Sequence, residues 1–215
     1  MTGRLASTFI ILFMETQARH LFWPSIRIIA HVLMGLCILI TIFPFAQQQT
    51  KKHHIQRWSK QLLALFRLKV KLTNADLLPE TGGYLIAANH ISWIDIASIQ
   101  SFLPCRFVAK SEVAGWPIFG WMAKQTGTLF IRRDNKRHGK EIAMQLEELL
   151  LKEPICIFPE GTSTAGDRVL PFKTNLFEPA AQTKVKTFPM AIRYLDEHHH
   201  YSDATALDRK STRLN

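Results

Sequence analysis

A histidine at the end of an apolar run and an aspartate shortly after it have the chemistry of a general base and its partner. Asn89 and His90 end the run Tyr84–Ala88, and Asp95 follows His90 after four intervening residues. A histidine can take a proton from a hydroxyl near neutral pH, and a nearby carboxylate fixes its tautomer and orientation. Residues five apart do not share a helix face, so the pair can meet only if His90 lies before the first helical turn.

The same stretch also fits a plain helix cap. Ser92 followed three residues later by Asp95 has the pattern of a capping box, with His90 then an ordinary loop residue. This stretch alone leaves both interpretations open, and the other motifs of the chain must decide between them.

Polar residues also follow two later apolar runs. Gly127–Ile131 leads into Arg133, and Ile155–Phe158 leads into Glu160 and Gly161. An arginine suits an anionic group, and a carboxylate in a glycine turn is a second acid. Because an α/β sheet collects the ends of its strands at one edge, we expect these groups to gather there.

The elements that must position these residues alternate between short strands and helices, which predicts an α/β fold. The sheet is expected to be mixed and flanked by helices, with membrane-anchoring helices at the N-terminus. We expect strands at 83–88, 106–109, 127–133, 155–158 and 185–193, and helices at 92–102, 142–151 and 172–182. The aromatic stretch 116–122 is either a corner of the core or an apolar wall that contacts lipid or an acyl chain.

The N-terminal part differs in character from the rest. Ile28–Ala46 contains His31 as its sole ionisable residue, which fits a transmembrane helix or an interfacial helix embedded from one side. Lys51–Lys71 is rich in Lys and Arg, has no acidic residue and carries apolar residues at helical spacing. Such basic clusters are drawn to anionic head groups and mark the cytoplasmic side of a membrane.

Length and charge bound the remaining choices. The 215 residues suggest one domain with an anchoring segment, divided into 1–71 (helical, membrane-associated), 72–200 (α/β) and 201–215 (an unstructured or truncated tail). The net charge of +10 favours anionic partners. No nucleic-acid-binding module, no paired-histidine metal motif and no glycine-rich phosphate loop is apparent, so we expect no nucleic acid and no metal.

Four blocks in order resemble the glycerolipid acyltransferase family, which contains 1-acylglycerol-3-phosphate acyltransferase. Residues 89–95 resemble the family's His-x4-Asp block, and 127–133 are similar to its second block. Residues 158–162 match the third, and 188–191 resemble the fourth, an apolar strand with a proline. The first and third blocks are specific, whereas the other two are weak alone. Together they favour a catalytic interpretation of His90 and Asp95.

The resemblance implies a membrane-bound O-acyltransferase of phospholipid biosynthesis. His90 would deprotonate an acceptor hydroxyl, which attacks the acyl thioester directly, and Asp95 would orient the imidazole. The donor would be acyl-CoA or acyl carrier protein as co-substrate, with no cofactor. The partners would be membrane lipid and a lyso-lipid acceptor, and the active site would face the cytoplasm at the inner membrane. The resemblance also implies substrate-binding residues: Arg133, Glu160, Gly161, Thr162 and Lys173.

One departure concerns the acceptor. Phosphate-using members of the family commonly have an arginine after the threonine of the third block, where this chain has Ser163. The acceptor is therefore either 1-acylglycerol-3-phosphate, which would give phosphatidic acid, or a lyso-lipid without that phosphate, such as lyso-ornithine lipid. Rival interpretations are a hydrolase, with Ser92 as nucleophile or a metal held by His90, Asp95 and Glu160, and a non-catalytic membrane adaptor.

Overall fold

The computed structural model describes residues 10–15, 22–132 and 136–195. Arg133, the histidines at 198–200 and the tail 201–215 lie outside this part of the chain. The strands are β1 Ile10–Glu15, β2 Lys69–Thr73, β3 Leu85–Ala88, β4 Arg106–Lys110, β5 Leu129–Ile131, β6 Ile155–Ile157 and β7 Thr187–Leu195. The α-helices are α1 Phe22–Thr41, α2 Gln48–Leu65, α3 Ile94–Gln100, α4 Phe119–Gln125, α5 Lys136–Leu150 and α6 Glu178–Thr183. Short 3₁₀ turns span Ala75–Leu77 (η1), Ser111–Gly115 (η2) and Thr174–Leu176 (η3).

The described chain divides into two compact units. The sheet unit comprises residues 10–12, 72–90, 105–132 and 136–192. The helical unit comprises residues 13–15, 22–71, 91–104 and 193–195. The boundary after residue 90 separates His90, in the sheet unit, from Asp95, in the helical unit.

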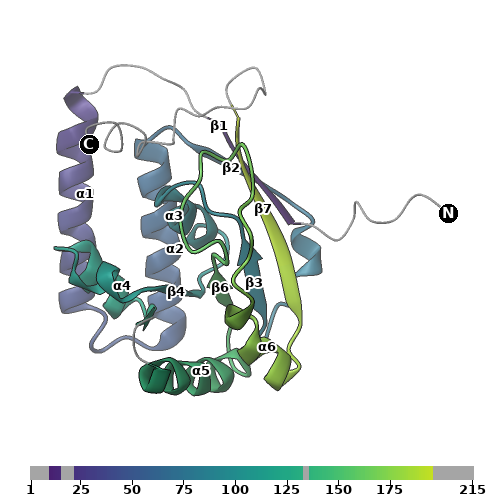
Figure 1. The fold of residues 1–215 in the computed structure, drawn as a ribbon. Coiled ribbons are helices and arrows are strands. Elements are labelled where there is room, and N and C mark those ends of the chain that lie inside the picture. The colour runs from purple at the N-terminus through teal and green to yellow at the C-terminus, as the bar shows by residue number, and fades with distance from the viewer. Residues whose placement is uncertain (1–9, 16–21, 133–135, 196–215) are drawn as a thin grey trace, which may run out of the picture. The chain divides into compact units, whose positions relative to one another are not determined.

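Within the sheet unit the strand order is β7-β3-β6-β4-β5 (Figure 1). β3 pairs in parallel with β6 on one side (Ile86 with Cys156) and with β7 on the other (Ala88 with Met190). β4 pairs in parallel with β6 and β5. The α/β prediction is therefore confirmed, and these four pairings are parallel, so their strands end at the same edge. The expected strands at 83–88, 106–109 and 155–158 agree with β3, β4 and β6 within one or two residues.

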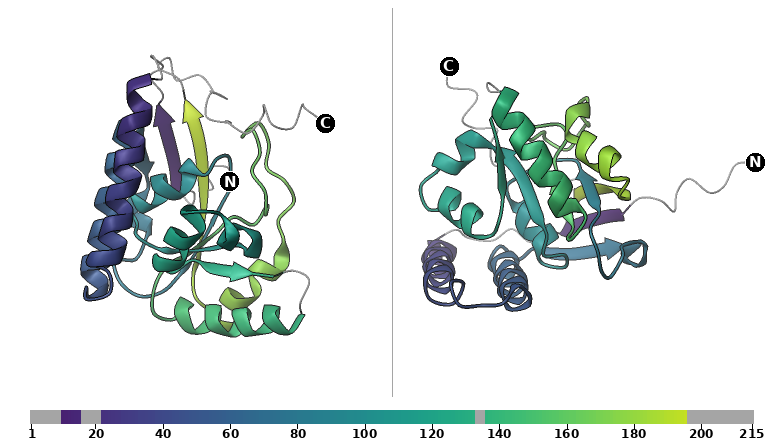
Figure 2. Two further views of the ribbon diagram at one scale, coloured as in Figure 1. Left: turned by 90° about the vertical axis from the view of Figure 1, so that its left-hand side faces the viewer. Right: turned by 90° about the horizontal axis from the view of Figure 1, so that it is seen from below.

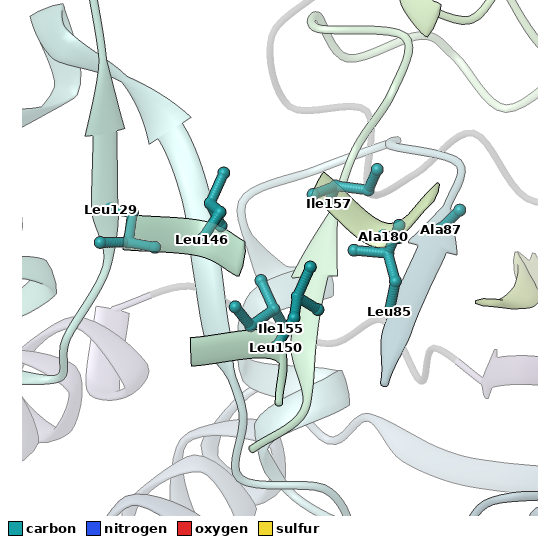
Figure 3. Close-up of a cluster of buried hydrophobic side chains, with 8 residues drawn as sticks. All are labelled: Leu85, Ala87, Leu129, Leu146, Leu150, Ile155, Ile157 and Ala180. Carbon is teal, nitrogen blue, oxygen red and sulfur yellow. The ribbon is translucent and has the colours of Figure 1, made fainter. Parts of the chain in front are cut away.

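The core of the sheet unit lies between the strands and helices α5 and α6 (Figure 3). Leu146 and Leu150 of α5 are spaced by four, so they lie on one face and pack on Leu85 and Ile155. Burying each such side chain contributes about 1.5–3 kcal/mol. Gly83 precedes β3 where a Cβ would lie 1.7 Å from the carbonyl oxygen of Leu150, so no side chain fits there.

The helical unit is built on α1 and α2, which pack side by side (Figure 2). At their contact the rings of His31 on α1 and Trp58 on α2 stack, with centroids 4.8 Å apart. Each ring also bonds the other residue's carbonyl, at 3.0 Å from His31 Nε2 and 3.1 Å from Trp58 Nε1. Helix α3, which carries Asp95, packs against α2, and the Gln56 side chain donates to the Phe102 carbonyl at 3.3 Å. The basic helix thus supports the segment that carries Asp95.

Helix α1 confirms that most of the apolar stretch 28–46 is helical, although the helix begins earlier and ends at Thr41. One side of it is exposed and apolar, with Ile26, Ile29, Leu33 and Ile40 spaced by three, four and seven residues. No helix in the described part of the chain has both the length and the apolar character needed to cross a bilayer.

The aromatic stretch before and within α4 is not a corner of the core. Trp116, Ile118 and Phe119 are 56%, 47% and 50% exposed, so that interpretation is wrong for these side chains. Ile118 has φ 62° and ψ −64°, and the Phe119 N–H donates to the Pro117 carbonyl at 2.6 Å. This is a γ-turn of the rare strained form, and a β-branched residue at its centre displays an apolar side chain to solvent.

Candidate active site

His90 lies directly beyond the end of β3, and its backbone is held at both polar atoms. Its N–H donates to Glu160 Oε1 at 2.9 Å, and its carbonyl accepts the Thr164 N–H at 2.9 Å. β3 and β6 are parallel neighbours, which explains why residues 70 positions apart meet. The expectation that these two strand ends converge is confirmed.

The imidazole of His90 stacks on the ring of Phe158, with centroids 4.1 Å apart and planes inclined by 20°. Phe158 is the residue that follows β6, so the same strand end supplies both the ring and Glu160. The backbone contacts with Glu160 and Thr164 do not involve the imidazole. The stacking therefore restricts the plane of the imidazole ring.

Glu160 is a buried carboxylate, 3% exposed, that joins two segments. Its Oε1 accepts from His90, and its Oε2 accepts the Leu170 N–H at 2.8 Å. The turn that follows depends on Gly161, whose φ of +69° favours glycine and whose N–H donates to the Phe158 carbonyl at 2.9 Å. Each oxygen of Glu160 therefore has a backbone donor, and the residue fastens the loop 161–170 to His90.

Asp95 lies in the first turn of α3, in the helical unit, and is fully buried. Its Oδ2 accepts the N–H groups of Ile91 and Ser92 at 2.7 and 2.9 Å. Its Oδ1 accepts the hydroxyl of Tyr194. The residue immediately after His90 is thus bonded directly to Asp95, which fixes the course of the chain through the His-x4-Asp block.

The capping interpretation of Ser92 is confirmed in part. Asp95 accepts the Ser92 N–H, as a capping box requires, and the Ile94 N–H reaches Ser92 Oγ at 3.5 Å. The helix begins at Ile94, however, and Trp93 occupies the N-cap position. Asp95 therefore caps the start of α3 through Oδ2, while its Oδ1 accepts the Tyr194 hydroxyl.

Tyr194 is a residue of this site that sequence reasoning missed. It is fully buried on β7, where Met190, Ile192 and Tyr194 alternate with more exposed residues. Burial and the neighbouring Asp95 carboxylate raise the pKa of the Tyr194 hydroxyl, so it stays protonated and donates. The alternation was a usable signal for burial, but nothing in it pointed to Asp95.

Asn89 and Thr164 were also not predicted to have their observed roles. The Asn89 amide donates to the Ile192 carbonyl at 3.1 Å and accepts the Ile192 N–H at 2.6 Å, so it continues the pairing of β3 with β7. Thr164 lies within the loop 161–170, and its position there carried no sequence signal. Both residues hold the backbone on either side of the His90 side chain.

The structure gives fewer contacts for the other residues that were predicted to bind substrate. Arg133 lies outside the described residues. Lys173 donates its backbone N–H to the Pro159 carbonyl at 2.9 Å, beside Glu160, and Thr162 is exposed in the turn. In the described part of the chain no three His, Cys, Asp or Glu side chains gather as metal ligands would. The substrate-binding roles of Arg133, Glu160, Gly161, Thr162 and Lys173 stay predictions.

The model of the Acyltransferase family matches residues 69–193, more than half of the chain. The chain therefore belongs to the Acyltransferase family. The match contains the whole sheet from β3 to β6, both carboxylates described above and most of β7.

Individual relatives agree with this assignment. A 1-acyl-sn-glycerol-3-phosphate acyltransferase of Neisseria gonorrhoeae is 38% identical over 136 residues, covering 62% of this chain and 53% of that protein. A lyso-ornithine lipid O-acyltransferase of Pseudomonas aeruginosa is 33% identical over 180 residues, covering 79% and 67%. The chain spans about half the length of the first of these two relatives.

A solved structure shares the fold. The crystal structure of the 1-acyl-sn-glycerophosphate acyltransferase PlsC from Thermotoga maritima superposes with a TM-score of 0.56. The match covers 89% of this chain and 98% of that chain at 17% sequence identity. At this identity the likeness supports the architecture of the chain alone.

Proposed function

We propose that this protein is an O-acyltransferase that moves a fatty acyl group from a thioester to the free hydroxyl of a lyso-lipid. The observation that carries the proposal is the placement of His90. A histidine at the end of a parallel strand, held at its N–H by Glu160 and at its carbonyl by Thr164, is a fixed base in a family of acyltransferases. The acyl thioester is a co-substrate, and the reaction needs no cofactor.

The reaction balances without an enzyme nucleophile. His90 takes the proton of the acceptor hydroxyl as its oxygen attacks the thioester carbonyl. The tetrahedral intermediate collapses, the carbon–sulfur bond breaks, and the imidazolium returns the proton to the leaving thiolate. Asp95 holds the imidazole in the required tautomer and stabilises its charged form. The donor is acyl-CoA or acyl carrier protein.

Two acceptors remain in competition, and a specific observation favours each. The sequence similarity to 1-acyl-sn-glycerol-3-phosphate acyltransferases, with Arg133 as an anion binder, supports 1-acylglycerol-3-phosphate as acceptor and phosphatidic acid as product. Ser163, in place of an arginine, removes one cation from the acceptor side. That absence and the similarity to lyso-ornithine lipid acyltransferases support lyso-ornithine lipid as the second candidate.

An acceptor panel separates the two candidates. Purified protein receives a labelled long-chain acyl-CoA or acyl carrier protein thioester together with either lyso-lipid, and the diacyl product is quantified. We expect transfer to at least one of them, and transfer to neither would overturn the proposal. Ser163→Arg should raise kcat/KM for the phosphate acceptor relative to the ornithine acceptor, because a guanidinium binds phosphate in a bidentate manner.

We further propose that the helical unit attaches the enzyme to the inner membrane, with the active site on the cytoplasmic side. The support is the exposed apolar face of α1, which includes Ile29 and Leu33, and the basic helix α2, which includes Lys51, Lys52 and Lys60. An apolar face beside a cluster of cations suits an anionic membrane surface. Flotation with vesicles tests this: binding to anionic vesicles should exceed binding to neutral ones and should weaken as salt increases.

A further inference from the structure

Tyr194 donates its hydroxyl to Asp95, the residue proposed to orient His90. The two side chains come from residues 99 positions apart, on β7 and α3, and both belong to the helical unit. Both are fully buried, so the bond between them is shielded from water. A hydrogen bond from a neutral hydroxyl to a buried carboxylate is charge-assisted and stronger than a neutral one.

The two oxygens of Asp95 are used differently. Oδ2 is occupied by two backbone N–H groups, from Ile91 and Ser92, which fix one edge of the carboxylate. Oδ1 accepts the Tyr194 hydroxyl, which fixes the rotation of the carboxylate about the Cβ–Cγ bond. A carboxylate oxygen can accept more than one donor, so a bond from Tyr194 to Oδ1 is compatible with a bond from a ring N–H to the same oxygen.

The strand that carries Tyr194 is held by a side chain two residues before it. On the same strand, Ile192 is tied through its backbone to the Asn89 side chain at 3.1 and 2.6 Å. Ile192 and Tyr194 lie two residues apart on β7 and therefore face the same side of the strand. The Asn89 side chain thus holds the backbone of β7 two residues before Tyr194.

We propose that Tyr194 is a positioning residue for acyl transfer, which orients the Asp95 carboxylate so that it can hold the His90 imidazole. This rests on the function proposed above, with His90 as base and Asp95 as its partner. Tyr194 acts through Asp95 and touches neither the acceptor nor the thioester. Its removal should therefore lower kcat and leave KM for both substrates unchanged.

The test uses Tyr194→Phe, which removes the hydroxyl and keeps the ring in place. We expect kcat to fall roughly tenfold, with KM within about twofold of the wild type, because a hydrogen bond to a charged group is lost. Tyr84→Phe is the matched control. Tyr84 is likewise buried, packs edge-on against Phe188 at 5.4 Å, and has a pKa raised by burial to about 12, but it lies at the opposite end of β3 from His90. Its kcat should stay at the wild-type value.

A double-mutant cycle separates positioning from a general effect on structure. In an Asp95→Asn background, Tyr194→Phe should change kcat by less than about twofold, because the carboxylate that it orients is gone. An additive loss in that background would overturn the proposal, as would an unchanged kcat in the single variant. A Tyr194→Phe chain that no longer folds, judged by thermal unfolding, would also overturn it by assigning the hydroxyl to folding.

The same assay distinguishes this failure from failure of the proposed function. Absence of acyl transfer by the wild-type chain, or unchanged transfer by Asp95→Asn, would overturn the assignment of the base and its partner. A wild-type enzyme that depends on Asp95 but not on the Tyr194 hydroxyl would overturn the further inference alone.

Discussion

The two buried carboxylates of the candidate site, Asp95 and Glu160, have similar surroundings and different arrangements of bonds. Each is almost inaccessible to solvent, and each accepts two backbone N–H groups. Glu160 accepts one N–H on each oxygen, from His90 and from Leu170, and so joins distant segments. Asp95 accepts both on a single oxygen, from residues three and four positions before it, and so its second oxygen meets a side chain.

We propose that this difference separates an acid that holds the backbone around His90 from one that orients the imidazole. A carboxylate whose two oxygens both face backbone donors fixes the chain around the base. A carboxylate with one oxygen directed to side chains is available to orient an imidazole. Both acids follow the same kind of strand-to-turn transition in the sequence, and burial alone does not tell them apart. The distribution of donors over the two oxygens does.

Asp95→Asn gives the largest effect expected from this comparison. The amide oxygen can keep both backbone N–H groups, but the NH2 group cannot accept the Tyr194 hydroxyl, so the fold should be kept with a loss of about 1–3 kcal/mol. The negative charge that supports the imidazolium is lost, and kcat should fall roughly 10²–10⁴-fold. Steady-state kinetics and urea unfolding measure the two quantities. A large loss of stability with little loss of kcat would reverse the role given to Asp95.

Glu160→Gln makes the same acid-to-amide change at the other carboxylate and should lower transfer much less than Asp95→Asn does. One of its two backbone donors, from His90 or from Leu170, would then face an NH2 group. A buried N–H without an acceptor costs about 1–3 kcal/mol, so the free energy of unfolding should fall by that amount. Transfer should fall as well, because the loop 161–170 loosens at His90.

The pair of amide variants is its own control, since charge and size change equally at both positions. Equal losses of transfer in the two variants would show that the distribution of donors does not distinguish the roles of the two acids. A fully stable Glu160→Gln with raised KM for the acceptor would instead support the predicted contact between Glu160 and substrate.

Thr164→Val should have the smallest effect of the series. The valine keeps the N–H that donates to the His90 carbonyl. It loses a hydroxyl that accepts the Gly166 N–H at 3.1 Å and lies 3.4 Å from the His90 carbonyl and 3.3 Å from the Arg168 carbonyl. We expect a loss of about 1 kcal/mol and a change in kcat within roughly fivefold. Thr183→Val is the control, because its hydroxyl bonds the Pro179 carbonyl at 2.7 Å within α6. An equal loss of activity in both variants would show that the Thr164 hydroxyl contributes no more to acyl transfer than the Thr183 hydroxyl does.

The sequence predicted the parts of this arrangement that follow from local pattern. Apolar runs ending in polar residues indicated β3 and β6, and their parallel pairing brought His90 and Glu160 together as expected. The spacing by four along α5 indicated the buried face that holds Leu146 and Leu150. These features depend on periodicity and on strand ends, which a single sequence contains.

The sequence did not predict the contacts that join distant segments. Tyr194 reaches Asp95, and Asn89 reaches Ile192, over about a hundred residues, and no local pattern encodes either pair. The exposed turn at Ile118 was also ambiguous, because an aromatic cluster has the same composition in a core and on a surface. The exposure of Trp116, Ile118 and Phe119 in the structure decided that case.

The central claim is that His90 is the base of acyl transfer, and His90→Ala tests it most directly. The backbone bonds to Glu160 and Thr164 do not involve the imidazole, so the variant should fold and unfold at a similar temperature. Transfer from a labelled acyl thioester to the preferred lyso-lipid should fall roughly 10²–10⁴-fold, with KM for the acceptor little changed. A folded His90→Ala protein that retains transfer within about tenfold of the wild type would contradict the claim.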